Sequence, residues 1–364
     1  MNRDANNAPR IEVRDLVVRY GDATAVDGVN FAIAPGEMVT LLGPSGCGKT
    51  TTLRSIAGLE TPWSGTITLN GETVFSGRER RNMPSEKRGV SMVFQSYAIW
   101  PHMTVFENVA YGLRVRKLPQ AEVASNVARV LDMVQMQSYG DRPASKLSGG
   151  QQQRVAVARA IAFSPTVVLF DEPLSNLDAK LRAEMRVELR ELQRRLDITS
   201  LYVTHDQEEA LAISDRVIVM NAGKIEQIGS PEAIYNQPNS RFVADFVGSA
   251  NMIPGRVVGD GDGGTVRFET EGGVRLAVSP PPGGRRNGTM VALRSAYIDL
   301  GAGAVSGVNR VSGTIHRRMF HGDFIQYVID WPAGQLIVRR PPTELFEEGG
   351  VVTVSFAAEH CVLL

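Results

Sequence analysis

Residues 43–50 read Gly-Pro-Ser-Gly-Cys-Gly-Lys-Thr, and this stretch decides the fold of the first part of the 364-residue chain. It is a complete G-x-x-x-x-G-K-[ST] phosphate loop. The apolar, β-favouring run Met38–Leu42 precedes it, and a helix-forming run that Gly58 closes follows it. Because strand, loop and helix come in the order that the motif requires, we expect a nucleoside triphosphate site rather than an ordinary glycine-rich turn.

Each residue type in the loop has its own task. Three glycines let the backbone wrap closely around phosphate oxygens, namely Gly43, Gly46 and Gly48. Lys49 places a cation on the β and γ phosphates, and the Thr50 hydroxyl is suited to ligate Mg²⁺. The remaining positions that we expect to line the nucleotide are Pro44, Ser45, Cys47 and Thr51.

A second strand, Thr166–Phe170, ends in two adjacent acids, Asp171 and Glu172. The strand is wholly apolar or β-branched and is therefore predicted to be buried, and open α/β sheets bind ligands at such carboxyl ends. Neighbouring side chains of an extended chain point to different sides, so the two acids can have different roles. We expect Asp171 to hold Mg²⁺ through a water molecule and Glu172 to be the general base or water-orienting group. A solvated acidic pair is the alternative.

A third motif, Leu-Ser-Gly-Gly-Gln-Gln-Gln-Arg at residues 147–154, opens a helix of good helix formers. Ser148, Gly149, Gly150 and Gln151 read as a plain N-cap when taken alone. A helix N-terminus carries about half a positive charge and free backbone N–H groups, which favours a triphosphate without holding it unaided. Such a helix start is suited to offer backbone N–H groups to the same phosphates from a second copy of the chain.

In this order the motifs resemble those of the ATP-binding subunits of ATP-binding-cassette (ABC) transporters. The resemblance implies ATP and Mg²⁺ as ligands, and two copies that sandwich two ATP molecules. It implies that Gln95 is the Q-loop glutamine, which reaches Mg²⁺ or the attacking water, that His205 is the switch histidine, and that Tyr20 stacks on adenine. It also implies that Ser175-Asn176-Leu177-Asp178 is the D-loop, in which Asp178 lies at the dimer interface. Taken singly, each of these residues is more often structural.

The pattern of predicted elements along the chain, and of glycine and proline between them, predicts two domains. Residues 1–238 alternate strands and helices and read as an α/β nucleotide-binding domain, with a helical insert at about 96–147. Within the insert, apolar residues at helical spacing predict a helix over Gln120–Gln137, and a second apolar stripe predicts one over Asp178–Leu196. Residues 239–364 predict a small all-β barrel, with short strands such as Met290–Leu293, Ile325–Ile329 and Val351–Val354. Glycine and proline separate them at 261–264, 280–284 and 301–307.

The C-terminal part resembles the OB-like TOBE domain of ABC importers. One departure is that Ser295-Ala296 follows Arg294 where proline and glutamate are common, which puts a ligand contact through that glutamate in doubt. OB folds often bind nucleic acid, but residues 239–364 hold twelve arginines, no lysine and twelve acids. The basic footprint of a nucleic-acid site is therefore missing, and we expect no such partner.

Composition bounds the remaining possibilities. Thirty-nine basic and thirty-nine acidic residues balance, so the chain has no net charge that would attract it to nucleic acid or to an anionic bilayer. Its two cysteines offer no disulfide framework. The first ten residues lack an apolar core and no apolar run has membrane length, so we expect no signal peptide and no spanning segment. Attachment to the cytoplasmic face of the inner membrane would then be peripheral, through two permease subunits.

The resemblance implies a homodimeric ATPase that energises import, with an extracytoplasmic solute-binding protein as an indirect partner. The sequence most resembles the branch of this family that imports ferric iron, polyamines and related solutes, with sugar import as the alternative. Residues 96–105 offer aromatics that we expect to be exposed to a permease helix, or else to pack within the insert. Two rivals fit less well: a non-transport ABC ATPase commonly has two cassettes or a coiled coil, and a small-molecule kinase has no use for residues 147–151.

Overall fold

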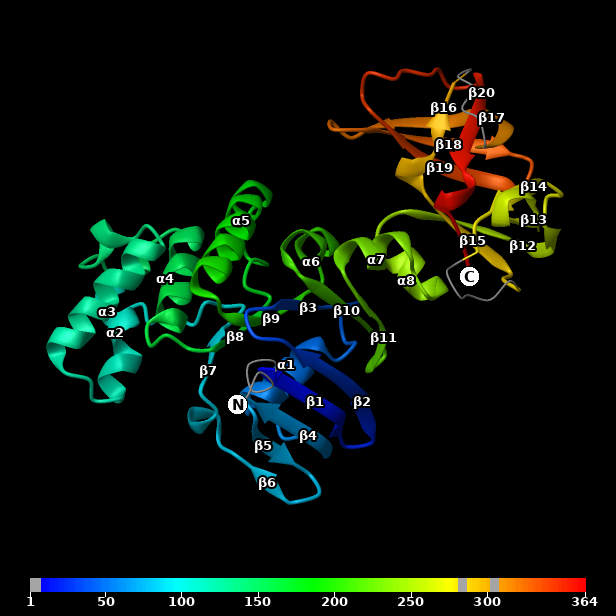
Figure 1. Ribbon diagram of the computed structural model, residues 1–364. Coiled ribbons are helices and arrows are strands. Elements are labelled where there is room, and N and C mark those ends of the chain that lie inside the picture. Colours follow the sequence, from blue (N-terminus) through cyan, green and yellow to red (C-terminus); the bar gives the residue numbers. More distant parts are fainter. Residues whose placement is uncertain (1–7, 281–286, 302–307) are drawn as a thin grey trace. The chain divides into compact units, whose positions relative to one another are not determined.

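Apolar segments around the phosphate loop pair side by side in a parallel sheet. The computed structural model describes residues 8–280, 287–301 and 308–364, and its contacts divide the chain into two units, Met1–Pro231 and Glu232–Leu364 (Figure 1). This division lies seven residues before Pro238, where the sequence placed the domain boundary. The two units are described separately below.

The first unit holds two sheets. The mainly parallel sheet has the order β11-β10-β3-β9-β8-β7, with only β11 antiparallel. Its strands are β3 (Met38–Leu42), β7 (Val90–Val93), β8 (Val167–Asp171), β9 (Thr199–Thr204), β10 (Arg216–Asn221) and β11 (Lys224–Gly229). The antiparallel sheet has the order β2-β1-β4-β5-β6. Its strands are β1 (Ile11–Tyr20), β2 (Ala23–Ile33), β4 (Ser64–Leu69), β5 (Glu72–Ser76) and β6 (Arg81–Asn82).

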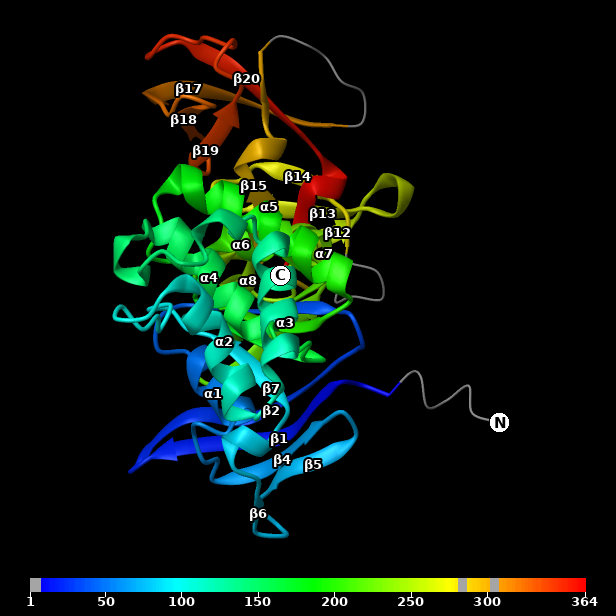
Figure 2. The same cartoon turned by 90° about the vertical axis from the view of Figure 1, so that its left-hand side faces the viewer.

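Alternating residues of the parallel strands face two separate cores. In β8, Val167 and Leu169 pack with the antiparallel sheet and α1 (Lys49–Ala57), whereas Val168 and Phe170 pack with the other helices. Those helices are α2 (Val105–Val115), α3 (Gln120–Met133), α4 (Gly149–Ile161), α5 (Ala179–Leu196) and α6 (Gln207–Ile213). Figure 2 looks onto the unit from the side of α2 and α3. The period-2 burial of both strand faces explains the continuous apolar runs in the sequence.

One helix end differs from the sequence prediction, and one predicted apolar stripe is confirmed. The helix predicted over Gln120–Gln137 ends at Met133, because Gln135 adopts a left-handed conformation with φ of 57°. The stripe on α5 is confirmed, since Met185, Leu189 and Leu192 are buried in the core. Short 3₁₀ turns in this unit cover Ser85–Lys87, Gln137–Tyr139 and Ala144–Lys146.

The second unit contains two five-stranded antiparallel sheets that share one core, so the predicted all-β domain is confirmed. One sheet comprises β12 (Ala250–Asp260), β13 (Val266–Thr270), β14 (Arg275–Val278), β15 (Met290–Arg294) and β21 (Cys361–Leu363). The other comprises β16 (Asp299–Leu300), β17 (Val308–Phe320), β18 (Ile325–Trp331), β19 (Gly334–Arg340) and β20 (Val351–Ala357). Two short helices accompany them, α7 (Pro231–Asn236) and α8 (Arg241–Phe246), with 3₁₀ turns at Asp262–Gly264, Ser295–Tyr297 and Ala358–His360.

Arg294, at the departure from the TOBE pattern, has a structural explanation. Its buried guanidinium donates to the carbonyl oxygens of Tyr235 and Ala244, in the last turns of α7 and α8. A cation is favourable at these negative helix ends. Most of the turns predicted at 280–284 and 301–307 lies outside the described residues.

Candidate functional site

The order of the parallel sheet gathers the phosphate loop, the paired acids and His205 at one edge. Strands β3, β9 and β8 are consecutive neighbours, and each runs in the same direction. The loops that leave their carboxyl ends therefore lie side by side, although they are far apart in the sequence. These strand ends and loops carry the phosphate loop, His205, and the two acids at the end of β8, Asp171 and Glu172.

The phosphate loop is built on a close approach of its backbone to neighbouring strands. Gly48, the N-cap of α1, has φ of 100°, and a Cβ there would lie 2.5 Å from the carbonyl oxygen of Ala25. Lys49 is buried, and its Nζ donates to the carbonyl oxygens of Gly43 at 2.8 Å and Pro44 at 2.9 Å. The ammonium group is thereby held inside the loop, where no carboxylate of a described residue forms an ion pair with it.

Thr50 and Asp171 form the first polar pair of the site. The Thr50 hydroxyl donates to Asp171 Oδ1 at 3.1 Å, and the Arg54 guanidinium donates to Oδ2 at 3.3 Å. Burial raises the pKa of Asp171, while the bonds from Thr50 and Arg54 act in the opposite direction. One carboxylate and one hydroxyl fit Mg²⁺, which binds proteins through one or two carboxylates and completes its shell with phosphates and water. The described residues contain no cluster of three or more His, Cys, Asp or Glu that would form an all-protein metal cage.

Glu172 and His205 form the second pair. His205 Nδ1 lies 3.1 Å from Glu172 Oε2, and the Glu172 side chain is 18% exposed. Asp171 and Glu172 do point to different partners, but Glu172 is not extended. Its φ is 45°, a left-handed conformation that costs a residue with a Cβ on the order of 1 kcal/mol. A backbone hydrogen bond from Glu172 N to Val203 O and a bond from the Ser175 hydroxyl to Glu172 O hold this conformation.

The other predicted residues make contacts of their own. Gln95 follows β7 and is exposed, and its carbonyl oxygen accepts a hydrogen bond from Asn176 of the predicted D-loop at 2.8 Å. Asp178 caps α5 by accepting from the backbone N–H of Leu181. Tyr20 is 49% exposed, and its hydroxyl donates to Glu60 at 2.7 Å.

The motif at residues 148–151 lies apart from the phosphate loop. Ser148 caps α4 in a capping box with Gln151, and Gly149 and Gly150 face Leu177 and Leu181. Because α4 packs on one face of the parallel sheet and α1 on the other, the two motifs are not brought together within one chain.

Comparisons with known proteins agree with this geometry. Residues 26–175 match the ABC transporter family model, and residues 291–364 match that of the TOBE domain. The chain is 42% identical to the spermidine/putrescine import ATP-binding protein PotA of Rubrobacter xylanophilus, over 100% of this chain and 95% of that protein. It is 47% identical to the Fe(3+) ions import ATP-binding protein FbpC of Agrobacterium fabrum, over 95% of each. The chain belongs to the ABC import ATP-binding subunits.

A solved structure supports the same assignment. The ABC transporter component cbiO1 of Clostridium perfringens superposes with a TM-score of 0.57 at 30% identity, over 62% of this chain and 90% of that one. The activity of this ABC subunit is ATP hydrolysis coupled to transport. No helix among the described residues is long and apolar enough to cross a membrane.

For residues 96–105 of this ABC subunit, the sequence left two alternatives open, exposure to a permease helix or packing within the insert. The structure favours packing, because Tyr97 is only 6% exposed and Trp100 is half-buried. The Trp100 and Tyr111 rings pack at a tilt, with centroids 4.5 Å apart. The Arg159 guanidinium lies 4.9 Å from the centre of the Trp100 ring and donates to the carbonyl oxygens of Tyr97 and Ala98. The aromatics thus pack within the insert, and Tyr111 is the more exposed ring.

Two residues that the sequence did not single out complete the site. Arg54 pairs with Asp171, and Glu60 accepts a hydrogen bond from Tyr20. Helical spacing from Thr50 to Arg54 is the only sequence signal that pointed to either of them.

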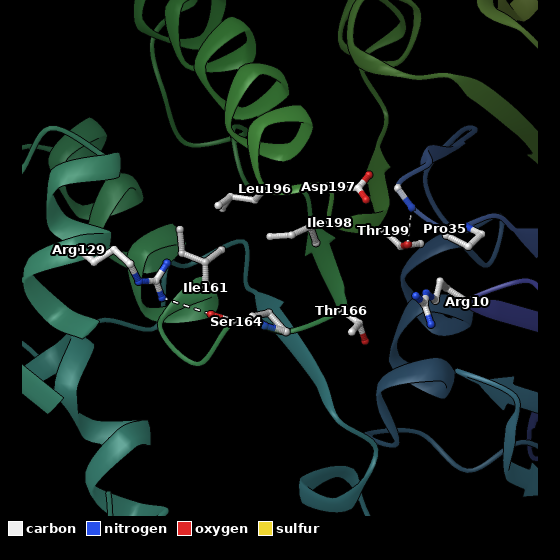
Figure 3. A pocket seen from close by; sticks show the side chains of 12 residues that line it. Arg10, Pro35, Arg129, Ile161, Ser164, Thr166, Leu196, Asp197, Ile198 and Thr199 are labelled. Carbon is white, nitrogen blue, oxygen red and sulfur yellow. Dashed lines mark hydrogen bonds between the residues drawn. The ribbon is translucent and has the colours of Figure 1, made fainter. Parts of the chain in front are cut away.

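A pocket of about 290 Å³ lies elsewhere, at the starts of β8 and β9, with Arg10 and Arg129 on opposite sides (Figure 3). It contains none of the predicted site residues.

Proposed function

We propose that this ABC subunit binds Mg-ATP at the carboxyl edge of the parallel sheet and hydrolyses it with Glu172 as the general base. The observation that carries the proposal is the arrangement of two polar pairs, Thr50–Asp171 and Glu172–His205, on neighbouring strand ends beside the phosphate loop. The proposed substrate of transport is ferric iron or a polyamine.

Nucleotide binding would use charges already gathered in the loop. Lys49 exchanges its bonds to the Gly43 and Pro44 carbonyls for bonds to phosphate oxygens, which are stronger because both partners are charged. Tyr20 offers a half-exposed ring for adenine. Thr50 and Asp171 would hold Mg²⁺, with Gln95 approaching from the end of β7. When bound, Mg²⁺ neutralises charge that develops on the phosphates.

Hydrolysis would depend on the second pair. Glu172 accepts a proton from the attacking water, and its carboxylate is kept in place by the left-handed backbone and by His205 at 3.1 Å. His205 is 58% exposed at its side chain, so it can also turn toward a γ-phosphate and donate to it.

A second copy of the chain would complete each site. The separation of α1 and α4 on opposite faces of the sheet supports this, because Ser148, Gly149, Gly150 and Gln151 cannot close on the phosphates held by their own Lys49. We propose that two chains enclose two ATP, with Asp178 at the interface. The all-β unit then serves as a regulatory or dimer-stabilising part.

The partners follow from the family. Import ATP-binding subunits act with membrane permeases, and we propose two permease subunits, a peripheral location at the cytoplasmic face of the inner membrane, and an extracytoplasmic solute-binding protein as an indirect partner. Ferric iron and polyamines are named for relatives that span almost the whole chain, which supports them over sugars.

The test is reconstitution of the chain with the permeases encoded beside it in proteoliposomes. ATPase stimulation by the neighbouring binding protein is measured with Fe³⁺, with spermidine and with maltose. Stimulation by Fe³⁺ or spermidine alone is the expected result. Stimulation by maltose alone would favour the sugar alternative, and ATP turnover that no permease alters would contradict a transport role.

A further inference from the structure

A buried polar network supports His205 from behind. Thr204, the last residue of β9, donates its hydroxyl to Glu209 Oε2 at 2.8 Å and accepts from the backbone N–H of Asp206 at 2.9 Å. Tyr202 donates to the same Glu209 oxygen at 3.1 Å. Asp206 in turn caps α6 by accepting from the N–H groups of Glu208 and Glu209. The backbone of His205 is therefore held on both sides by hydrogen bonds of its chain neighbours, while its side chain stays exposed.

Arg182 joins this network to the predicted D-loop. Its guanidinium donates to the carbonyl oxygen of Leu177 at 2.9 Å, and it lies 3.5 Å from Asp206 Oδ2 and 3.9 Å from Glu209 Oε1. The Leu177 segment continues directly from Glu172, whose carbonyl oxygen accepts from Ser175. One side chain thus contacts the segments that follow both Glu172 and His205.

The position of Arg182 in α5 is unfavourable by itself. It lies in the first turn of the helix, where the macrodipole disfavours a cation. Asp206 and Glu209 offset this cost by placing two carboxylates beside it. Arg186 is the other arginine at this face, and it pairs with the exposed Glu208 at 3.9 Å.

A small cavity lies among these groups. It has a volume of about 30 Å³ and is lined by Glu172, His205, Ser175, Arg182, Thr204, Asp206 and Glu209. Arg182 Nε is buried and has no hydrogen-bond partner among the described residues. The gap of 3.9 Å from Nε to Glu209 Oε1 is too long for a direct hydrogen bond, and the cavity is polar and about the size of one water molecule.

We propose that Arg182 is a positioning residue for the hydrolysis reaction, and that it holds the Glu172 and His205 segments in register through Leu177, Asp206 and one water molecule bridging to Glu209. Arg182 touches neither the phosphate loop nor the Thr50–Asp171 pair in any contact of the described residues. It therefore acts on turnover and not on nucleotide affinity. The inference rests on the proposed roles of Glu172 and His205.

The experiment compares steady-state ATPase kinetics of the full-length chain carrying Arg182→Met, Arg182→Lys or the matched control Arg194→Met. Arg194 is exposed in the last turn of the same helix. We expect Arg182→Met to lower kcat about 10- to 100-fold with KM for ATP unchanged, because a misplacement of about 1 Å can cost 10²-fold in rate. Arg182→Lys keeps the charge and should recover part of the loss, and Arg194→Met should match the wild type.

Two further measurements separate the possible outcomes. Asp206→Asn keeps a good N-cap for α6 but removes the carboxylate charge beside Arg182. If the two side chains act together, this change should lower kcat less in the Arg182→Met background than it does alone. A high-resolution structure should show the bridging water. Wild-type kcat in Arg182→Met, or a loss of kcat that comes with an equal rise in KM and a lower melting temperature, would overturn the inference. Glu172→Gln is assayed in parallel, because normal hydrolysis in that variant removes the proposed base whatever Arg182 does.

Discussion

Replacing Glu172 by glutamine is the most direct test of the site. The change keeps the shape of the side chain and a hydrogen-bonding group near His205 Nδ1, which lies 3.1 Å away, but it removes the proton acceptor. Loss of a positioned general base costs about 10²- to 10⁴-fold in rate. This corresponds to about 3 to 5 kcal/mol in the activation barrier.

Nucleotide binding should survive the same change. Glu172 makes no contact with Lys49 or Thr50 in the hydrogen bonds of the described residues, so ATP remains bound and should trap a closed homodimer. The assay is phosphate release by the purified variant with its permease present, together with size-exclusion chromatography in ATP. Glu184→Gln, an isosteric change of an exposed acid on α5, is the control and should behave as wild type. Near-normal phosphate release by Glu172→Gln would remove this residue from the role of base.

Three further outcomes are expected. Lys49→Ala should weaken ATP binding and abolish hydrolysis, because the triphosphate loses its buried cationic partner, and wild-type affinity in isothermal titration would mean that this loop is not the nucleotide site. Asp171→Asn should abolish hydrolysis but not lower the melting temperature at pH 7. Burial raises the pKa of Asp171, so the ionised carboxylate destabilises the folded state at pH values above that pKa. This destabilisation decreases as the pH falls, because the carboxyl group is then protonated. A lower melting temperature of Asp171→Asn at pH 7 would contradict this reasoning. A chain that ends near Gln237 should keep its affinity for ATP, since every proposed catalytic residue precedes position 206, and lost binding with native α/β circular dichroism would assign part of the site to the all-β unit.

Much of the site could be predicted from local sequence. The strand, loop and helix around Lys49 follow from residues close together in the chain, and the glycines predicted to wrap the backbone have φ of 80° at Gly46 and 100° at Gly48. Helical spacing predicted the buried face of α5, and apolar runs predicted the parallel strands. The sequence left exposure or packing open at Tyr97, because its environment includes Arg159, which lies 62 positions later in the chain and donates to the Tyr97 carbonyl oxygen.

By itself, the sequence determined the motifs, their order and the class of each element, because these depend on backbone preferences and on hydrophobic periods within a few residues. Tertiary structure alone decided which side chains meet. Thr50 and Asp171 are 121 positions apart, and the left-handed backbone of Glu172 is held by β9 and the D-loop segment. Arg182 reaches Asp206 across 24 positions. Such contacts arise from the strand order β3-β9-β8, which packing of the whole sheet selects and which no local window of sequence contains.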